Sequence, residues 1–346
     1  MVLASRKTLV IQLVILAAVG ALVPSVSGDY FLHVYAIGFY YVILALSWNL
    51  LAGYTGQFAL ATHAFSSIGG YASALLVIYT PVPLAVGVLG GTIFAGIIGY
   101  GLGVLTLNLR KIYLALATWA FAESYRLFIT TEYEYTRGDL GLHTPIFFDT
   151  VEPLPYYFLL LVVMILTIWL VYEVLHSRVG FYLRAIRDDE EAAQSMGINT
   201  VRWKLFAFTF TSMLAGMAGA FAGHYIGLLS PAVVKFNEMA LIIIMVCTGG
   251  MRSFWGPVIG AMFIQIFSEL LRVNAAYFQG FSELIRDIAE NRMVIFAVLV
   301  ILLMRFYRDG INGFIHALWP YLRRQVAKAR RELTFSTTGS TFPEEK

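Results

Sequence analysis

The chain has 346 residues, of which 59% are hydrophobic and only 13% are charged, and its formal net charge is +3. A soluble domain carries about 25% charged residues, so this composition excludes a soluble globular protein and indicates an integral membrane protein. Cys247 is the single cysteine, which excludes an intramolecular disulfide and gives no support to a thiolate metal site. The sequence contains no Gly-x-x-x-x-Gly-Lys-Ser/Thr phosphate loop, so we do not expect this chain to hydrolyse nucleotides.

Ten apolar segments follow one another along the chain, and a membrane-spanning helix needs roughly 20 mainly apolar residues. They lack the alternation over about ten residues that marks the strands of a membrane barrel. The eighth segment is the shortest. We therefore predict an all-α integral membrane protein of about ten transmembrane helices, at residues 8–27, 31–52, 64–79, 82–107, 112–131, 154–175, 205–226, 237–251, 254–272 and 291–307.

The first of these segments also has features of a secretory signal. Arg6 and Lys7 precede its apolar run, and the small residues Ser27 and Gly28 lie near its end. We favour a retained helix over a cleaved signal. Cleavage would leave the later topology unchanged.

The basic residues set the orientation, because lysine and arginine concentrate in cytoplasmic loops. A cytoplasmic N-terminus places the basic loop 176–204 and the basic tail 311–346 inside the cell, and it places the acidic loop 132–153 outside. We therefore predict a transmembrane domain over 1–310 with both termini in the cytoplasm.

An internal repeat is suggested by topology rather than by residue identity. If segments two to five correspond to segments seven to ten, the offset of five spans reverses their direction. The chain would then contain the 5+5 inverted repeat that is common in transporters.

The most polar stretch between two apolar runs is residues 184–197, in the loop 176–204. An aspartate followed three positions later by a glutamate can form a capping box, acids suit a helix start, and glycine can end a helix in a left-handed conformation. The pattern predicts a short helix over 189–196 with an exposed small and apolar face. A solvated loop helix is the simpler alternative. The residues are Asp188 as N-cap, Glu191 completing the box, Glu190 at the helix start, Ala192, Ala193 and Met196 as the insertion face, and Gly197 as terminator.

The same stretch resembles a known family. Glu191-Ala-Ala-x-x-x-Gly197 is similar to the coupling signature of ABC importer permeases, and residues 184–199 resemble more narrowly the branched-chain amino acid ABC transporter permease family. Three further segments carry the resemblance, which covers roughly residues 44–272. They are Gly53-Tyr-Thr-Gly-Gln57 with Ala64-Phe-x-x-Ile-Gly-Gly-Tyr71, Thr136-Arg-Gly-Asp-Leu-Gly-Leu142, and Gly249-Gly-x-x-Ser-x-x-Gly-Pro-x-x-Gly-Ala261.

The chain departs from the family pattern at several positions. Ala59, Ala61 and His63 replace the serine, glycine and alanine that the family often has, and Arg252 stands where glycine is frequent. The distal Leu-Pro of the wider coupling signature is absent. These differences leave the fold and the transporter class unchanged but put the exact substrate in doubt.

The resemblance implies a transmembrane subunit of a high-affinity leucine, isoleucine and valine importer, of the second permease type and with a type II ABC importer-like fold. Its implied partners are a second homologous permease, two cytoplasmic ABC ATPase subunits, an external or periplasmic binding protein and the lipid bilayer, with no nucleic acid. ATP and Mg²⁺ would be used by the ATPase, and this chain would bind no cofactor. The implied location is the cytoplasmic (inner) membrane of a bacterium or archaeon, as a multi-pass protein. The predicted ATPase contacts are Asp188, Glu190, Glu191, Ala192, Ala193, Met196 and Gly197.

A backbone break is predicted at the inner end of the second span, where glycines and a glutamine follow the apolar run. Irregular backbone at membrane depth is tolerated only where it is buried in protein or lines water, so such a break could expose polar groups to a solute. A plain turn between two helices is the alternative. The candidate pathway residues are Asn49, Gly53, Gly56, Gln57, Thr62 and His63.

Two acids inside predicted spans lie three positions before an arginine, namely Glu123 before Arg126 and Glu269 before Arg272. Neighbours at this helical spacing can pair, and a charge at the bilayer centre is costly when unpaired. We favour structural pairing over substrate or proton handling. Glycines in the fourth span and the Gly219-x-x-x-Gly223 motif predict close helix packing.

Three functions are alternatives to the importer. A urea or short-chain amide ABC importer permease is the nearest alternative. An ion-coupled secondary transporter would normally carry acids or histidines deep in the bundle. No paired carboxylates, nucleophile with a base, or metal-ligand spacing supports a membrane enzyme, so no catalytic and no metal-binding residues are expected.

Overall fold

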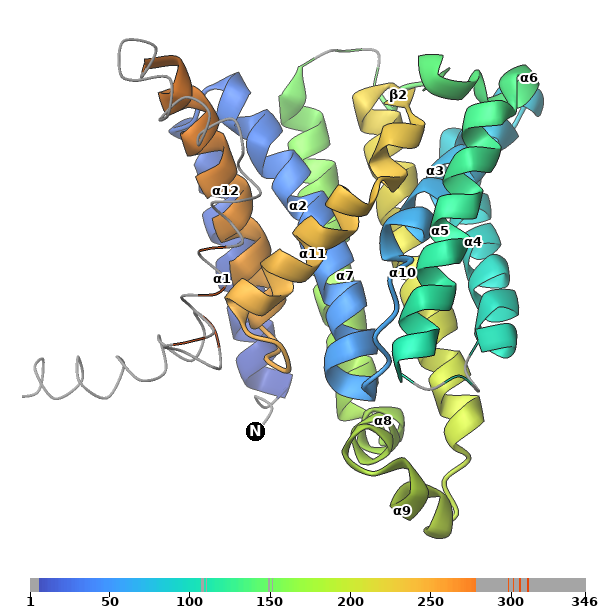
Figure 1. Cartoon of the computed structure of the whole chain (residues 1–346). Coiled ribbons are helices and arrows are strands. Elements are labelled where there is room, and N and C mark those ends of the chain that lie inside the picture. The colour runs from blue at the N-terminus through green and yellow to red at the C-terminus, as the bar shows by residue number, and fades with distance from the viewer. Residues whose placement is uncertain are drawn as a thin grey trace, which may run out of the picture.

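The computed structural model describes residues 6–106, 109, 111–148, 150 and 152–277, together with the isolated positions 298, 301, 305 and 310. This part of the chain is a bundle of helices (Figure 1), which confirms the prediction of an all-α membrane protein at the level of fold class. The predicted tenth span, 291–307, and the basic tail, 311–346, lie outside the described residues apart from isolated positions.

Six described helices are long and apolar enough to cross a membrane. They are α1 (Arg6–Leu22, extended by η1, Val23–Ser25), α2 (Asp29–Asn49, extended by η2, Leu50–Tyr54), α4 (Leu84–Thr106), α7 (Pro153–His176), α10 (Thr200–Ile226) and α12 (Gly256–Tyr277).

Three further helices lie at predicted spans, but each is either too short or not apolar enough to be counted among these six. They are α3 (Thr62–Tyr79), α5 (Lys111–Thr131) and α11 (Phe236–Gly249). With 14 residues, α11 is too short to cross the bilayer alone. The total of ten spans therefore stays a prediction.

Two groups of short elements lie at opposite ends of the bundle (Figure 1). At one end lie α6 (Tyr133–Thr136), η3 (Gly138–Leu140), and strands β1 (Leu142–His143) and β2 (Leu228–Leu229), which pair antiparallel with Leu142 opposite Leu229. At the other end lie α8 (Arg178–Asp188) and α9 (Glu190–Ser195), and α1 starts at this same end of the bundle. We call these the α6 end and the α9 end. Loops 132–153 and 176–204 thus lie on opposite sides, as the charge pattern predicts, while the assignment of the α9 end to the cytoplasm stays a prediction.

Helices α3, α4 and α10 interlock through glycines. A Cβ atom at Gly69 would overlap the backbone of Gly216, one at Gly91 would overlap the carbonyl oxygen of Gly69, and one at Gly219 would overlap the carbonyl oxygen of Ser66. Small residues let helix backbones approach this closely inside a membrane. The core of the bundle therefore has little room for larger side chains along this seam.

The predicted backbone break after the second span is present. At Leu50–Tyr54 the end of α2 becomes a π-helical turn, and residues 55–61 then run back along the helix that precedes them. Trp48 Nε1 donates to the Ala59 carbonyl oxygen at 2.9 Å, and Gly56 adopts a φ of +71°. Helix α3 therefore begins inside the bundle rather than at its end (Figure 1).

A second break follows α10. Gly227 ends that helix with a φ of +76°, the 3-10 helix η4 (Pro231–Val234) follows β2, and α11 begins at Phe236. The two breaks meet, because His63 Nε2 lies 3.0 Å from the carbonyl oxygen of Val234. Helices α3 and α11 leave this meeting point toward opposite ends of the bundle (Figure 1). This arrangement is what the predicted inverted repeat requires, while the full repeat stays a prediction because its last span is outside the described residues.

Candidate functional site

Helix α9 is capped at its start by Asp189, whose Oδ1 accepts from the Ala192 amide at 3.0 Å. The prediction that Asp188 is the N-cap is wrong by one residue. Asp188 is the last residue of α8, and its Oδ1 accepts from Arg187 Nε at 3.0 Å. Because α8 continues to this point, the chain turns one residue later, and Ala192 rather than Glu191 stands three positions after the cap. No capping box forms.

The end of α9 agrees with the prediction for Gly197. This glycine has a φ of +83°, and its amide donates to the Gln194 carbonyl oxygen at 2.9 Å. The next amide, of Ile198, donates to the Ala193 carbonyl oxygen at 3.1 Å. These two bonds form a Schellman motif, which satisfies carbonyls at the helix end and fixes its length.

One side of α9 is held against the start of α10. Lys204 Nζ lies 2.5 Å from Glu190 Oε1, and Gln194 Nε2 donates to Thr200 Oγ1 at 2.8 Å. Ala193 is three positions from Glu190, so it points to the same side, and it is only 4% exposed. The prediction that Ala193 belongs to an outward insertion face is therefore wrong.

The opposite side of α9 is open. Glu191, Ala192 and Ser195 are exposed, and Met196 beyond the helix is 83% exposed. These four residues form what we call the outer face of α9. They combine one acid with small and apolar side chains.

A cavity of about 710 Å³ lies at the α9 end and joins the two regions that the sequence singles out. Its walls come from the break after α2, from the start of α5, and from the α8–α9 segment with Lys204. The lining includes Thr55, Gly56, Gln57, Tyr113, Arg187, Asp188, Glu190 and Glu191. The structure thus brings predicted pathway residues and predicted coupling residues around one space.

Arg187 bridges the two walls of this cavity. Its Nη1 donates to the carbonyl oxygen of Gly53 at 3.1 Å, while its Nη2 donates to Asp188 Oδ1 at 2.8 Å. A Cβ atom at Gly56 would lie 3.2 Å from Arg187 Cγ, so the arginine packs directly on the break. Sequence reasoning missed this residue, because its partner lies 134 positions away.

Gln57 is the predicted pathway residue with the clearest capacity for a polar ligand. It is 4% exposed and lines the cavity, yet neither its Oε1 nor its Nε2 has a hydrogen-bond partner among the described residues. A buried amide without a partner is costly in a native protein. Water or a solute in the cavity could satisfy it.

Gly56 lines the cavity together with Gln57, whereas the predicted pathway residues Asn49, Gly53, Thr62 and His63 lie outside its lining. Asn49 Nδ2 donates to the Ser253 carbonyl oxygen at 3.1 Å, and Asn49 Oδ1 accepts from the Arg252 amide at 3.3 Å. Asn49 therefore holds the turn between α11 and α12. Arg252 there has a φ of +72°, which explains why glycine suits that position in the family.

Gly53 meets the cavity only through the hydrogen bond from Arg187 to its carbonyl oxygen. Thr62 and His63 are buried at the start of α3. His63 contacts the second break, as described above, and its Nδ1 has no partner among the described residues.

Polar residues at the second break were missed by sequence reasoning. Lys235 and Asn237 are exposed and Glu238 is half-buried at the start of α11, where Tyr41 donates its hydroxyl to Glu238 Oε2 at 2.8 Å. The signal was present, since these three polar residues lie within four positions. Asn237 and Glu238 fall at the start of the predicted eighth span, 237–251, and Lys235 lies just before it.

Both predicted ion pairs form. Arg126 Nε donates to Glu123 Oε1 at 3.0 Å, and Arg272 Nε donates to Glu269 Oε1 at 2.8 Å. Tyr30 joins the second pair by accepting from Arg272 Nη2 at 2.7 Å. These contacts support structural pairing over ion transport.

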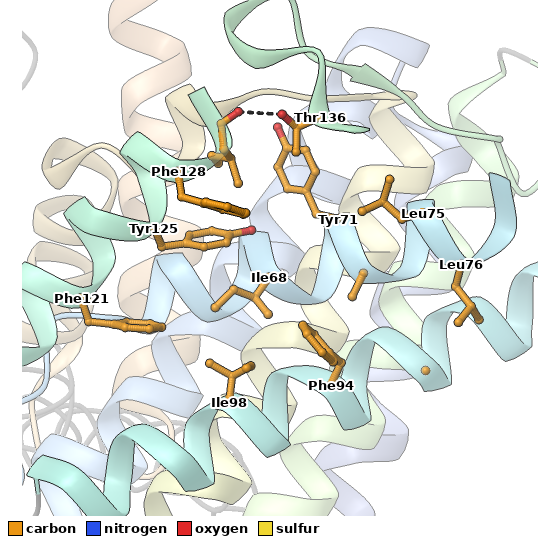
Figure 2. Close-up of a pocket in the computed structure, with 13 residues that line it drawn as sticks. Ile68, Tyr71, Leu75, Leu76, Phe94, Ile98, Phe121, Tyr125, Phe128 and Thr136 are labelled. Atoms are coloured by element: carbon orange, nitrogen blue, oxygen red, sulfur yellow. Dashed lines mark hydrogen bonds between the residues drawn. The ribbon is translucent and has the colours of Figure 1, made fainter. Parts of the chain in front are cut away.

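A second cavity, of about 600 Å³, lies between α3, α4 and α5 (Figure 2). Figure 2 shows apolar side chains turned into it from all three helices, including Ile68, Phe94, Ile98, Phe121 and Phe128. Near its α6 end, Thr136 donates its hydroxyl to the Ile129 carbonyl oxygen at 2.7 Å. This lining suits hydrocarbon rather than a polar solute.

The comparisons with known proteins agree with this geometry. The chain matches the family described as the permease component of branched-chain amino acid transport systems over residues 30–304. It is 28% identical over 326 residues to the high-affinity branched-chain amino acid transport system permease protein LivM of Salmonella typhimurium, covering 84% of this chain and 71% of that protein. The identity to LivM of Escherichia coli K12 is 28% over 305 residues, covering 78% and 67%.

The chain is also similar to another high-affinity branched-chain amino acid transport system permease protein, LivH. The chain is 23% identical over 301 residues to LivH of Salmonella typhimurium, covering 80% of this chain and 92% of LivH. No solved structure matches the chain. The family match spans most of the sequence and confirms the resemblance carried by the four motifs. This chain is a multi-pass membrane protein that belongs to the permease-component family of branched-chain amino acid transport systems.

Proposed function

We propose that this chain is one of two permease subunits in an ATP-driven importer and that it translocates branched-chain or related zwitterionic amino acids delivered by an external binding protein. The α9 end faces the cytoplasm in this proposal, and the outer face of α9 docks on a separate ATPase subunit. The similarity to both LivM and LivH supports a pair of related permeases.

One observation carries the proposal. The α8–α9 segment presents an open face to a partner and is linked by Arg187 to the broken end of α2 across a shared cavity. A displacement of α8 and α9 would therefore displace the Gly53 backbone as well, because Arg187 of α8 is hydrogen-bonded to the Gly53 carbonyl oxygen. Closure of the ATPase dimer would favour one arrangement of the break, and the loaded binding protein would favour another, as coupling requires.

The first test is retention of the ATPase by the purified complex. Glu191→Arg and Met196→Arg place a cation on the outer face of α9, where both side chains are exposed. We expect each to weaken ATPase retention and ATP-driven uptake about tenfold or more, the loss typical when one charged or buried interface residue is disrupted. Glu134→Arg, exposed at the α6 end, is the matched control and should retain the ATPase.

Two outcomes would contradict the proposal. One is full ATPase retention by both α9 variants. The other is uptake that persists after ATP depletion but collapses with the proton gradient, which would identify a secondary transporter. The substrate is tested separately by the thermal shift of the cognate binding protein with leucine, valine, urea and small amides. Stabilisation by urea alone would favour the amide importer.

A further inference from the structure

The start of α11 lies at the middle depth of the bundle, which three contacts establish. Val234, just before it, accepts the contact from His63 at the inner start of α3. Glu238 accepts from Tyr41, which lies near the centre of the 26-residue span Asp29–Tyr54. The ring of Phe236 lies 5.9 Å from that of Trp119, near the middle of α5. Residues 234–238 therefore sit far from either end of the membrane-spanning helices.

Charged and polar groups at this depth are open on the outside of the chain. Lys235 and Asn237 are exposed, and Glu238 is half-buried. Although Lys235 and Glu238 are three positions apart, no ion pair joins Lys235 to Glu238 or to any other residue of the described ranges. Exposure of such groups to lipid is costly, and intramembrane ionisable residues almost always face a bundle interior or a water-filled space. Asn237 is too short to reach the headgroups as a lysine can.

Aromatic rings adjoin these polar groups. Trp119 is 42% exposed and Phe236 is 47% exposed, so their paired rings present an apolar surface beside the charges. On the other side, the buried His63 keeps an Nδ1 atom without a partner among the described residues. A cation, an acid, an amide and one aromatic ring thus lie within residues 235–238, and Trp119 of α5 adds the second ring.

We propose that Lys235, Asn237 and Glu238 bind the charged backbone of a zwitterionic amino acid in the translocation pathway, with Phe236 and Trp119 against its apolar side chain. The proposal rests on the proposed function, in which two permeases form the importer; we place this face on a water-filled path beside the second permease. The Lys235 ammonium and the Asn237 amide would donate to the substrate carboxylate. Glu238 Oε1 would accept from the substrate ammonium, since Tyr41 already occupies Oε2. An uncharged amide such as urea can form hydrogen bonds here but no ion pair with either charge, so we expect it to bind more weakly than a zwitterion.

The first test measures leucine uptake by the complete transporter in proteoliposomes, with its binding protein. Lys235→Met removes the charge at similar length, and Glu238→Gln keeps an acceptor for Tyr41. We expect uptake to fall about tenfold or more for each variant, as for the loss of a hydrogen bond to a charged group. Stimulation of ATP hydrolysis by the loaded binding protein should persist, because neither residue touches the α9 end. Lys7→Met and Glu134→Gln, exposed at opposite ends of the bundle, should transport normally.

Uptake by both site variants at the level of the controls would overturn the inference. A second measurement does not depend on coupling. In a Cys247→Ser background of the same complex, Asn237→Cys should react with a charged, water-soluble thiol reagent, and leucine but not urea should slow the reaction. Val162→Cys, on an outward position of α7 that is 62% exposed, should not react. An unreactive Asn237→Cys, or one that leucine does not protect, would contradict the site.

Absence of ATP-driven uptake by the unaltered complex would instead count against the proposed function. The thiol reaction and its protection by leucine would still decide the site in that case. The two proposals therefore fail in different experiments.

Discussion

Arg187 connects α8 to the broken end of α2 through a single side chain. Its guanidinium group donates both to the Gly53 carbonyl oxygen and to Asp188, a forked geometry that lysine cannot reproduce. Because the side chain is 20% exposed, its hydrogen bonds are partly shielded from water. Displacement of α8 by a docked partner would therefore pull directly on the backbone of the break.

We expect Arg187→Ala to uncouple ATP hydrolysis from uptake. Removing the bridge lets α8 move without moving the break, and loss of one coupling residue changes the coupling free energy by about 0.5–2 kcal/mol. Uptake per ATP hydrolysed should fall, and Arg187→Lys should restore only part of it. The measurement is the ratio of transported substrate to released phosphate in proteoliposomes. Arg178→Ala, an exposed arginine of the same loop, is the control. A parallel loss of uptake and hydrolysis at Arg187 would show only a stability defect.

At the scale of elements, the glycine seam fixes how α3, α4 and α10 pack. The backbones approach closely at Gly69, Gly91, Gly216 and Gly219. These contacts hold α3 in place along its length, although the chain just before this helix is not helical. Since α3 starts inside the bundle, this seam supports the position of His63 and hence the meeting of the two breaks. The polar segments are thus positioned by apolar packing.

Two glycine-to-alanine substitutions should shift stability in opposite directions. At Gly219 a Cβ atom would overlap the Ser66 carbonyl oxygen, so Gly219→Ala should destabilise the protein by about 1–3 kcal/mol, as overpacking does. At Gly101 nothing lies within 4 Å, so Gly101→Ala should gain up to about 1 kcal/mol from helix propensity. Thermal unfolding of the two variants in one detergent checks the sign. Equal melting temperatures would refute the tight contact at Gly219.

At the scale of the whole molecule, the two polar ends are distinct. The α6 end carries exposed acids such as Glu134, and the α9 end carries the capped helix. The two breaks meet between these ends at the contact of His63 with Val234. The proposed importer needs such an arrangement, since a solute would meet polar groups at mid-depth while each end would engage a different partner.

Opposite exposure of the ends can be measured by thiol labelling in intact cells. In the Cys247→Ser background, Glu134→Cys at the α6 end should react with a membrane-impermeant reagent, because that end is proposed to face outward. Ser195→Cys, exposed on α9, should react only after the cells are opened. Labelling of Ser195→Cys in intact cells would reverse the proposed orientation.

Features that depend on neighbouring residues could be predicted from the sequence. Apolar length identified the six described helices that can cross a membrane, Gly53 and Gly56 with Gln57 marked the break, and Gly197 marked the end of α9. The motifs around these positions identified the family. Each of these signals is local, since hydropathy, helix ends and left-handed backbone are set by a few consecutive residues.

Contacts between distant segments were decided only by the tertiary structure. It joined Arg187 to Gly53, turned Ala193 inward against α10, and brought the second break beside His63, which placed Lys235 and Glu238 at mid-depth. The single-residue shift of the helix cap to Asp189 also depended on how far α8 extends. The sequence by itself determined the membrane class, the family and the position of the first break. The side-chain partners required the folded chain, because they depend on which remote helices pack together and at what depth.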